Sequence, residues 1–114
     1  MINVFFVDDE ERVLNSFKRL LQLSRNSYRF HFFLSGKEAL ASPVEPVVLI
    51  TDAKMPEMDG YELIRRMKAR FPSLVTVMLT GMVDPENPEH TDCDHHLEKP
   101  CDIQDILSLL PGKD

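Results

Sequence analysis

The sequence contains few cysteines and no long apolar run. Its 114 residues include two cysteines, Cys93 and Cys101, which are too few for the disulfide framework of a small secreted protein and are typical of reduced intracellular thiols. No apolar run is long enough to span a bilayer, and no basic segment precedes an apolar stretch at the start of the chain. We therefore expect a cytoplasmic domain with no membrane contact.

Positive charge is also scarce. Thirteen basic residues against nineteen acidic ones give a net charge of -6, so the overall field does not attract nucleic acid or anionic membranes. The one basic cluster comprises Arg65, Arg66, Lys68 and Arg70, near the end of a predicted helix. Basic side chains there complement the helix dipole, so the cluster predicts a solvated face and no direct nucleic-acid contact. A cation is the better partner for this chain.

What the sequence does contain is the composition and pattern of one globular domain. Hydrophobic residues make up 43% of the chain and charged residues 28%, which favours a single domain over residues 1–114 with a buried core. Apolar strand patterns occupy residues 2–7, 28–34, 47–51, 75–79 and about 95–98. Helical periodicity occupies residues 13–21, 37–41, 63–71 and 103–110. Apolar strands that alternate with helices predict a parallel sheet covered on both faces, a three-layer α/β fold.

One segment breaks this alternation. Residues 81–95 contain Pro85 and Pro88 among many polar residues, and they show no apolar periodicity where a fourth helix would be expected. We therefore expect the helix between the fourth and fifth strands to be short or missing.

Polar residues follow four of the five predicted strands. Asp8 and Asp9 follow the first strand, Asp52 the third, Thr80 the fourth and Lys99 the fifth. Because ligands of parallel sheets bind beyond the carboxyl ends of the strands, we expect these side chains to converge. Crowded carboxylates repel one another unless a cation shares the site, and Mg²⁺ prefers such oxygen ligands.

This combination is typical of phosphoryl transfer. Asp52 can act as the nucleophile, while Lys99 and the metal neutralise charge on the transferring group. Thr80 and nearby backbone N–H groups can donate hydrogen bonds to its oxygens, and Gly81 leaves room for it. Each acidic residue alone could instead cap a helix or start a turn, so the prediction depends on their joint occurrence at successive strand ends.

The same residues resemble the receiver domains of two-component response regulators, and the likeness covers essentially the whole chain. The matching motifs, in the family's order, are Asp8-Asp9, Asp52, Met55-Pro56, Asp59-Gly60, Thr80-Gly81 and Lys99-Pro100. The resemblance implies a flavodoxin-like, doubly wound five-stranded sheet with strand order 2-1-3-4-5. It also implies a signalling domain that takes a phosphoryl group from a histidine kinase or histidine phosphotransfer protein. Phosphorylation would switch an output surface toward an effector domain or downstream protein.

The resemblance also implies a role for each site residue. Asp52 would be the phosphoacceptor, and Thr80 and Lys99 would assist the domain's own phosphorylation and dephosphorylation, without making it an enzyme in the ordinary sense. The implied Mg²⁺ ligands are Asp8, Asp9, Asp52 and the backbone carbonyl of Lys54, with Asp8 acting through water.

Two further positions follow from the resemblance. Thr80 and the residue three positions before Lys99, which is His96, would form the switch. The charge of a histidine can change near neutral pH, so we expect the switch to be sensitive to pH. Lys54 and Met82 occupy the positions that tune hydrolysis of the acyl phosphate. Neither is a carboxylate or amide that would position a water molecule, so we expect slow loss of the phosphoryl group.

Three other interpretations remain open. Five potential zinc ligands lie within twelve residues, namely His90, Cys93, His95, His96 and Cys101, although their spacing matches no standard zinc finger. The chain could also be a magnesium-dependent phosphatase, although Lys54 stands where a second acid would be needed. It could finally be a receiver-fold scaffold that acts without phosphorylation.

Overall fold

The computed structural model describes residues 2–21, 28–81, 93–99 and 101–111. Its elements are β1 (Ile2–Val7), α1 (Glu11–Leu21), β2 (Tyr28–Phe33), α2 (Gly36–Ala41), β3 (Val48–Asp52), α3 (Gly60–Arg70), β4 (Val75–Thr80), β5 (His95–Glu98) and α4 (Ile103–Leu107). All the strands and helices predicted from apolar patterns are present, with ends shifted by no more than three residues. The expected short or missing helix before β5 falls on residues 82–92, outside the described residues.

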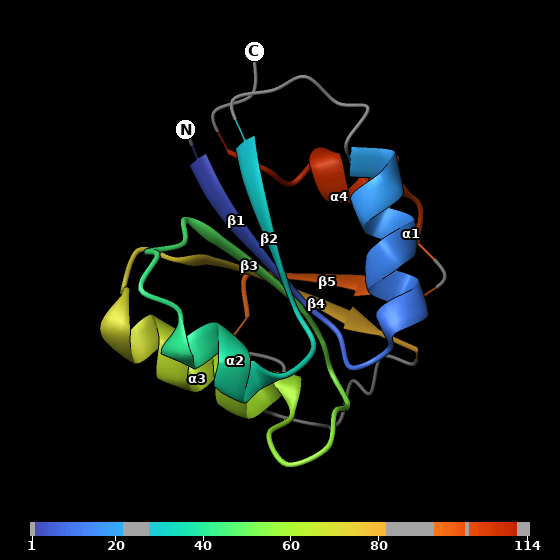
Figure 1. Ribbon diagram of the computed structural model, residues 1–114. Helices are drawn as coiled ribbons and strands as arrows, with labels where there is room; N and C mark the ends of the chain where they lie inside the picture. The colour runs from blue at the N-terminus through green and yellow to red at the C-terminus, as the bar shows by residue number, and fades with distance from the viewer. Residues whose placement is uncertain (1, 22–27, 82–92, 100, 112–114) are drawn as a thin grey trace.

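The five strands form one parallel sheet in the order β2-β1-β3-β4-β5, which confirms the order implied by the family resemblance. Helices α1 and α4 lie against one face, and α2 and α3 lie against the other (Figure 1). The described part of the chain therefore has the predicted three layers. No helix within it is long and apolar enough to cross a membrane.

Alternate residues of the strands build two apolar cores. On β1, Phe5 and Val7 belong to the core beneath α2 and α3, whereas Val4 and Phe6 belong to the core beneath α1 and α4. All four side chains are fully buried. Because successive residues of a strand point to opposite faces, burial of both faces requires a continuous apolar run. The first polar side chain after this apolar run is that of Asp8, where β1 ends.

The short edge strand β5 is fastened to β4 at both ends. At its start, Thr76 donates its backbone N–H to Oδ2 of Asp94 at 2.8 Å, and Nζ of Lys68 lies 3.1 Å from the same oxygen. Burial alone would raise the pKa of Asp94, but the contacts with Thr76 and Lys68 outweigh burial and lower that pKa. At its end, the backbone N–H of Lys99 donates to the carbonyl of Thr80 at 2.7 Å. The position of Lys99 is thereby set by the sheet.

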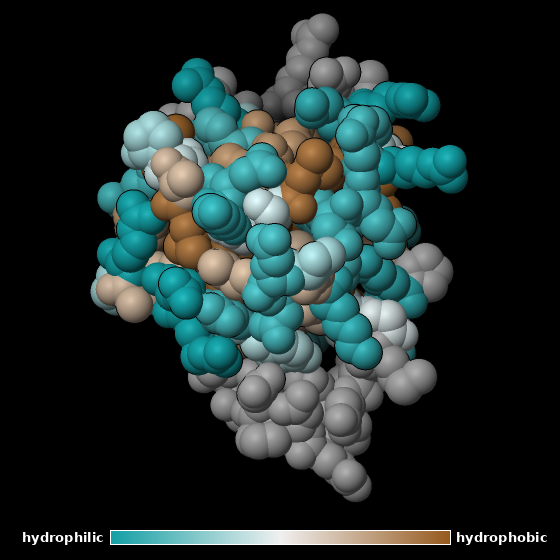
Figure 2. Space-filling view, turned by 60° about the horizontal axis from the view of Figure 1, so that its bottom comes forward, coloured by the Kyte–Doolittle hydropathy of each residue, from teal (hydrophilic) through white to brown (hydrophobic). Residues whose placement is uncertain are grey.

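Three basic side chains of α3, those of Arg66, Lys68 and Arg70, have partners within the domain. Nη2 of Arg66 lies 2.7 Å from Oε2 of Glu62 one turn earlier, and Nη1 of Arg70 donates to the carbonyl of Leu40 at 2.8 Å. Hydrophilic side chains also cover most of the described surface in the view of Figure 2. These contacts fit the predicted solvated helix face.

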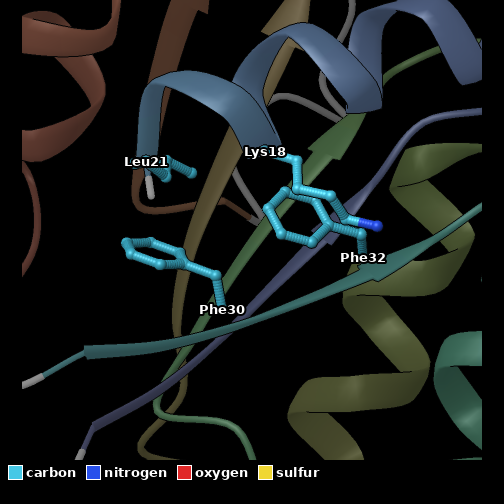
Figure 3. Close-up of a pocket in the computed structure, with 4 residues that line it drawn as sticks. All are labelled: Lys18, Leu21, Phe30 and Phe32. Atoms are coloured by element: carbon cyan, nitrogen blue, oxygen red, sulfur yellow. The ribbon is translucent and has the colours of Figure 1, made fainter. Parts of the chain in front are cut away.

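Helix α1 leaves part of the outer strand β2 uncovered. A hollow of about 370 Å³ between them is lined by Lys18, Leu21, Phe30 and Phe32 (Figure 3). Nζ of Lys18 lies 5.4 Å from the centre of the Phe32 ring, at which distance a cation is attracted to the aromatic face. The charged end of Lys18, on α1, thus lies over part of this aromatic surface.

A close approach between two backbones sets the start of α3. Asp59 caps the helix by accepting a hydrogen bond from the backbone N–H of Glu62 at 2.9 Å, and Gly60 is the first helical residue. A Cβ atom at Gly60 would lie 2.3 Å from the carbonyl oxygen of Asp52 and 2.9 Å from Sδ of Met78. The lack of a side chain therefore lets α3 begin directly against the end of β3.

We expect Gly60→Ala to lower the free energy of unfolding by about 1 to 3 kcal/mol, because backbone and Met78 must move to admit the methyl group. Urea denaturation followed by circular dichroism measures the change. Gly81→Ala is the matched control, since a Cβ there meets no atom within 4 Å, and we expect it to change stability by less than about 0.5 kcal/mol. Equal losses in the two variants would contradict the steric explanation.

Candidate functional site

The five polar residues predicted at strand ends lie at the carboxyl edge of the sheet. Asp8 and Asp9 follow β1, Asp52 ends β3, Thr80 ends β4 and Lys99 follows β5. Strands β1, β3, β4 and β5 are neighbours in that order, so these residues come from one continuous part of the edge. The parallel topology therefore gathers residues that are far apart in the sequence.

Three carboxylates form a close group at this edge. One oxygen from each of Asp8, Asp9 and Asp52 lies within 4.8 Å of the others. Within residues 2–21, 28–81, 93–99 and 101–111, no other group of three potential metal ligands is this compact. Asp8 is completely buried, Asp52 is 8% exposed and Asp9 is exposed, so the group opens to solvent on the side of Asp9.

The carboxylate of Asp8 is incompletely paired. Its Oδ1 accepts a hydrogen bond from the backbone N–H of Glu10 at 2.9 Å, whereas its buried Oδ2 has no hydrogen-bond partner and lies 3.6 Å from Nζ of Lys99. Burial raises the pKa of Asp8; the hydrogen bond from Glu10 opposes this rise, and the negative charge of Asp52 adds to it. An ionised Asp8 is therefore unfavourable unless another cation approaches.

Lys99 provides positive charge to this group. Its Nζ lies 3.0 Å from Oδ1 of Asp52. Burial alone would lower the pKa of Lys99, but the hydrogen bond and charge of Asp52, with the charges of Asp8 and Glu10, outweigh burial and raise it. Lys99 is therefore protonated at neutral pH and faces three carboxylates with a single charge.

The loop after Asp52 closes back onto the end of β3. Oδ1 of Asp52 accepts a hydrogen bond from the backbone N–H of Ala53 at 3.0 Å, and the N–H of Gly60 donates to the carbonyl of Ala53 at 2.8 Å. Between them Glu57 has φ of 68°, which is uncommon for a residue other than glycine. Thr80, 6% exposed, borders the same region from the end of β4. The loop and the neighbouring strand thus hold Asp52 in a fixed setting.

Four other residues were singled out in the sequence, and the structure describes two of them, Lys54 and His96. The side chain of Lys54 is exposed, and the role of its carbonyl as a metal ligand stays a prediction. His96 lies half-buried on β5, with Nε2 3.1 Å from Sγ of Cys93. Met82 and His90 lie outside the described residues.

The proposed zinc ligands do not form a three-ligand group among the described residues. Cys93 and His96 are in contact, but two ligands are too few for a structural zinc site. His95 is exposed on the same strand. The structure therefore gives the zinc hypothesis no support.

Two contacts became specific only in the structure, one made by Asp8 and one between a thiol and an imidazole away from the carboxylates. The bond between Asp8 and the N–H of Glu10 has a local signal, because an aspartate commonly binds the N–H two residues later. It also means that Asp8 helps the chain enter α1, as the simpler interpretation expected. The contact between Cys93 and His96 depends on bends at residues 93–94, and no sequence pattern indicated it.

The residues of the edge fit Mg²⁺. They offer three oxygen ligands, one of which includes a buried oxygen without a hydrogen-bond partner. One ammonium group against three carboxylates leaves negative charge that a divalent cation would offset. The exposed side at Asp9 leaves space for the water molecules that Mg²⁺ usually retains.

Comparisons with known proteins agree with this fold and site. The family model "Response regulator receiver domain" matches residues 4–111. The chain is 33% identical to the "Uncharacterized transcriptional regulatory protein YesN" of Bacillus subtilis, over 96% of this chain and 32% of that protein. It is 30% identical to the "Heme response regulator HssR" of Staphylococcus epidermidis, over 94% of this chain and 49% of that protein. The chain thus spans half or less of the length of these relatives.

Solved structures give the same result. The signal receiver domain of an HD domain-containing protein from Pseudomonas fluorescens Pf-5 superposes with a TM-score of 0.80 at 29% identity, covering 94% of this chain and 89% of that one. The fold and the carboxylate edge are those of a phosphorylation-controlled signalling module. The chain belongs to the response regulator receiver domain family.

We expect Asp8→Asn to raise the free energy of unfolding in metal-free buffer at pH 7 by about 1 to 2 kcal/mol, because it removes a buried charge with an unpaired oxygen. A carboxyl whose pKa is raised by folding destabilises the protein only where it ionises, so the gain should vanish as the pH falls toward about 4. Urea denaturation across this pH range measures the gain.

The matched control is Asp9→Asn, since Asp9 is exposed and the change should be below about 0.5 kcal/mol. Adding Mg²⁺ should stabilise the unmodified chain more than Asp8→Asn, because the variant loses a ligand. If Asp8→Asn is less stable than the unmodified chain when a chelator is present, the ionised Asp8 does not destabilise the metal-free fold and the explanation is wrong.

Proposed function

We propose that Asp52 is the phosphoacceptor and receives its phosphoryl group from a phosphohistidine of a histidine kinase or histidine phosphotransfer protein. The observation that carries this proposal is the 3.0 Å contact between Nζ of Lys99 and Oδ1 of Asp52, at an edge where Asp8 and Asp9 converge. Family membership supports the same role. At 8% exposure, Asp52 is still open to a donor from the solvent side.

The transfer joins a carboxylate oxygen of Asp52 to phosphorus. The phosphorus–nitrogen bond of the donor breaks, and its electron pair leaves with the imidazole. Lys99 can then stabilise charge on the phosphoryl oxygens, and the hydroxyl of Thr80 can donate a hydrogen bond to one of them. Because Nζ of Lys99 already lies 3.0 Å from Asp52, little reorganisation of this ammonium group is needed when the donor arrives.

Asp8, Asp9, Asp52 and the backbone carbonyl of Lys54 are the groups that would hold Mg²⁺. When bound, Mg²⁺ neutralises charge on the phosphoryl group and among the carboxylates. The N–H of Glu10 orients Asp8, and its Oδ2, which has no hydrogen-bond partner, would be available to the ion or to a water molecule that the ion holds.

An apolar hollow beside the site favours a protein as the phosphodonor. It measures about 370 Å³ and is lined by Val13, Phe17, Leu79, Lys99 and Cys101. An apolar side chain of the donor protein can be buried here, between α1 and the strand ends, while its phosphohistidine reaches Asp52. Such a central apolar anchor is typical of protein interfaces.

The output of the domain is a change in the conformation of the surface that its partner binds. We assign the switch to Thr80 and His96, with the acyl phosphate favouring one of two conformations. The two named relatives are longer than this chain, and YesN is named as a transcriptional regulatory protein, which supports an effector domain or a downstream protein as the receiver of the signal. We place this exchange in the cytoplasm.

Incubation with Mg²⁺ and acetyl phosphate should add one phosphoryl group to the chain, detected by intact-mass spectrometry. Asp52→Ala and a chelator should each abolish the adduct, and Lys99→Ala should slow its formation by about a hundredfold, as expected for loss of a charged group that stabilises the transferring group. Asp59→Asn is the matched control, because Asp59 is an exposed carboxylate of the same loop and asparagine also caps helices.

The outcomes separate the alternatives. An adduct that forms equally in Asp52→Ala would refute the assigned phosphoacceptor. Steady release of phosphate from small esters would favour the phosphatase. If no adduct forms with acetyl phosphate or a phosphohistidine protein, and Asp52→Ala still binds its partner, the domain is a scaffold.

The phosphorylated chain should lose its phosphoryl group slowly once the donor is removed. The exposed Lys54 offers no carboxylate or amide to orient an attacking water molecule. Lys54→Asn should therefore shorten the half-life severalfold, whereas Lys37→Asn, at another exposed lysine on α2, should leave it unchanged. Rapid loss from the unmodified chain, measured by mass over time, would contradict this expectation.

A further inference from the structure

A cysteine and a histidine meet beside the edge strand, away from the carboxylates. Sγ of Cys93 lies 3.1 Å from Nε2 of His96 and 3.3 Å from the carbonyl oxygen of His95. Both side chains are half-buried, so the pair is neither sealed in the core nor fully in water. A thiol within hydrogen-bonding distance of an imidazole has a base that can take its proton.

The surroundings hold this pair in place. Asp94, the next residue, is bonded to the backbone and hydroxyl of Thr76 and to Lys68, which anchors the chain just before β5. His96 itself lies within β5, paired with Met78 of β4. His96 is therefore held by the sheet, and Cys93 directly precedes a residue that is anchored to β4.

The second cysteine offers the opposite environment. Burial raises the pKa of the Cys101 thiol, and the negative charge of Asp105 raises it further. Cys101 lines the apolar hollow beside Lys99, and no imidazole occurs among the described residues that line it. The chain thus contains two half-buried thiols that differ in whether a base accompanies them.

We propose that Cys93 and His96 form a thiol modification site at which a low-molecular-weight disulfide becomes attached to Cys93. His96 takes the thiol proton, and the sulfur of Cys93 attacks one sulfur of the disulfide. A new sulfur–sulfur bond forms as the donor's bond breaks, and the departing thiolate takes the proton from His96. A small thiol reverses the reaction, as in other reversible caps on cysteine.

The size of the effect follows from thiol chemistry. An ordinary cysteine is only about 3% thiolate at pH 7, so complete ionisation would speed attack about thirtyfold. A more acidic thiol is a weaker nucleophile, which reduces the gain to about two- to fourfold. The site lies on the strand that leads to Lys99, so it would give the domain a second chemical input.

The test is the rate at which glutathione disulfide modifies each cysteine of the purified, reduced chain at pH 7, followed by intact mass and peptide mapping. Cys93 should react at least about two- to fourfold faster than Cys101, and Cys93→Ser should remove the fast phase. His96→Gln and His96→Phe should each slow Cys93 to the rate of an ordinary thiol. His95→Phe is the matched control on the same strand and should leave the rate unchanged.

The ultraviolet absorption of the thiolate tells loss of the base in the His96 variants apart from a change in the fold. In a Cys101→Ser background this absorption should be present with His96 and lost in His96→Gln, while circular dichroism stays the same. Equal rates for the two cysteines, or a full rate in His96→Gln, would overturn the proposal. Disulfide exchange at Cys93 needs no phosphorylation of Asp52. The two proposals can therefore fail independently, and each has its own measurement.

Discussion

The contact of Lys99 with two carboxylates is the interaction on which the rest of the site depends. Asp8 and Asp52 bring charge into a largely buried edge of the sheet, where ionised groups are costly unless they are paired. Nζ of Lys99 lies 3.0 Å from Oδ1 of Asp52 and 3.6 Å from Oδ2 of Asp8. Its single positive charge cannot balance the negative charges of these two carboxylates and Asp9 together. The charge left over is what a cation would offset. The excess negative charge of the carboxylates therefore both destabilises the metal-free site and allows it to bind the cation that the proposed function needs.

That contact is held by an edge strand of only four residues, which would be marginal by itself. The bond from Thr76 to Asp94 fixes its start, and the bond from Lys99 to Thr80 fixes its end. The ammonium group can thus stay near Asp52. The pair of Cys93 and His96 lies on the same short segment, so both chemistries depend on how firmly β5 adds to the sheet.

Much of the fold follows from local sequence patterns. The strands were predictable because burial on both faces demands uninterrupted apolar runs, and β1 and β5 have the predicted ends. The third strand continues one residue further than expected, to Asp52, because Asp52 still pairs with Leu79 of β4. The strand order came from the family resemblance, since the apolar pattern by itself does not specify which strands are neighbours.

The sequence by itself determined which residues stand at the carboxyl ends of the strands, because strand ends and polar residues are both readable along the chain. Only the tertiary structure decided that Asp8 keeps an unpaired buried oxygen and that Lys99 lies closest to Asp52. It also decided that Cys93 meets His96. Burial and distance between side chains depend on how distant segments pack, and no local pattern of residues encodes that.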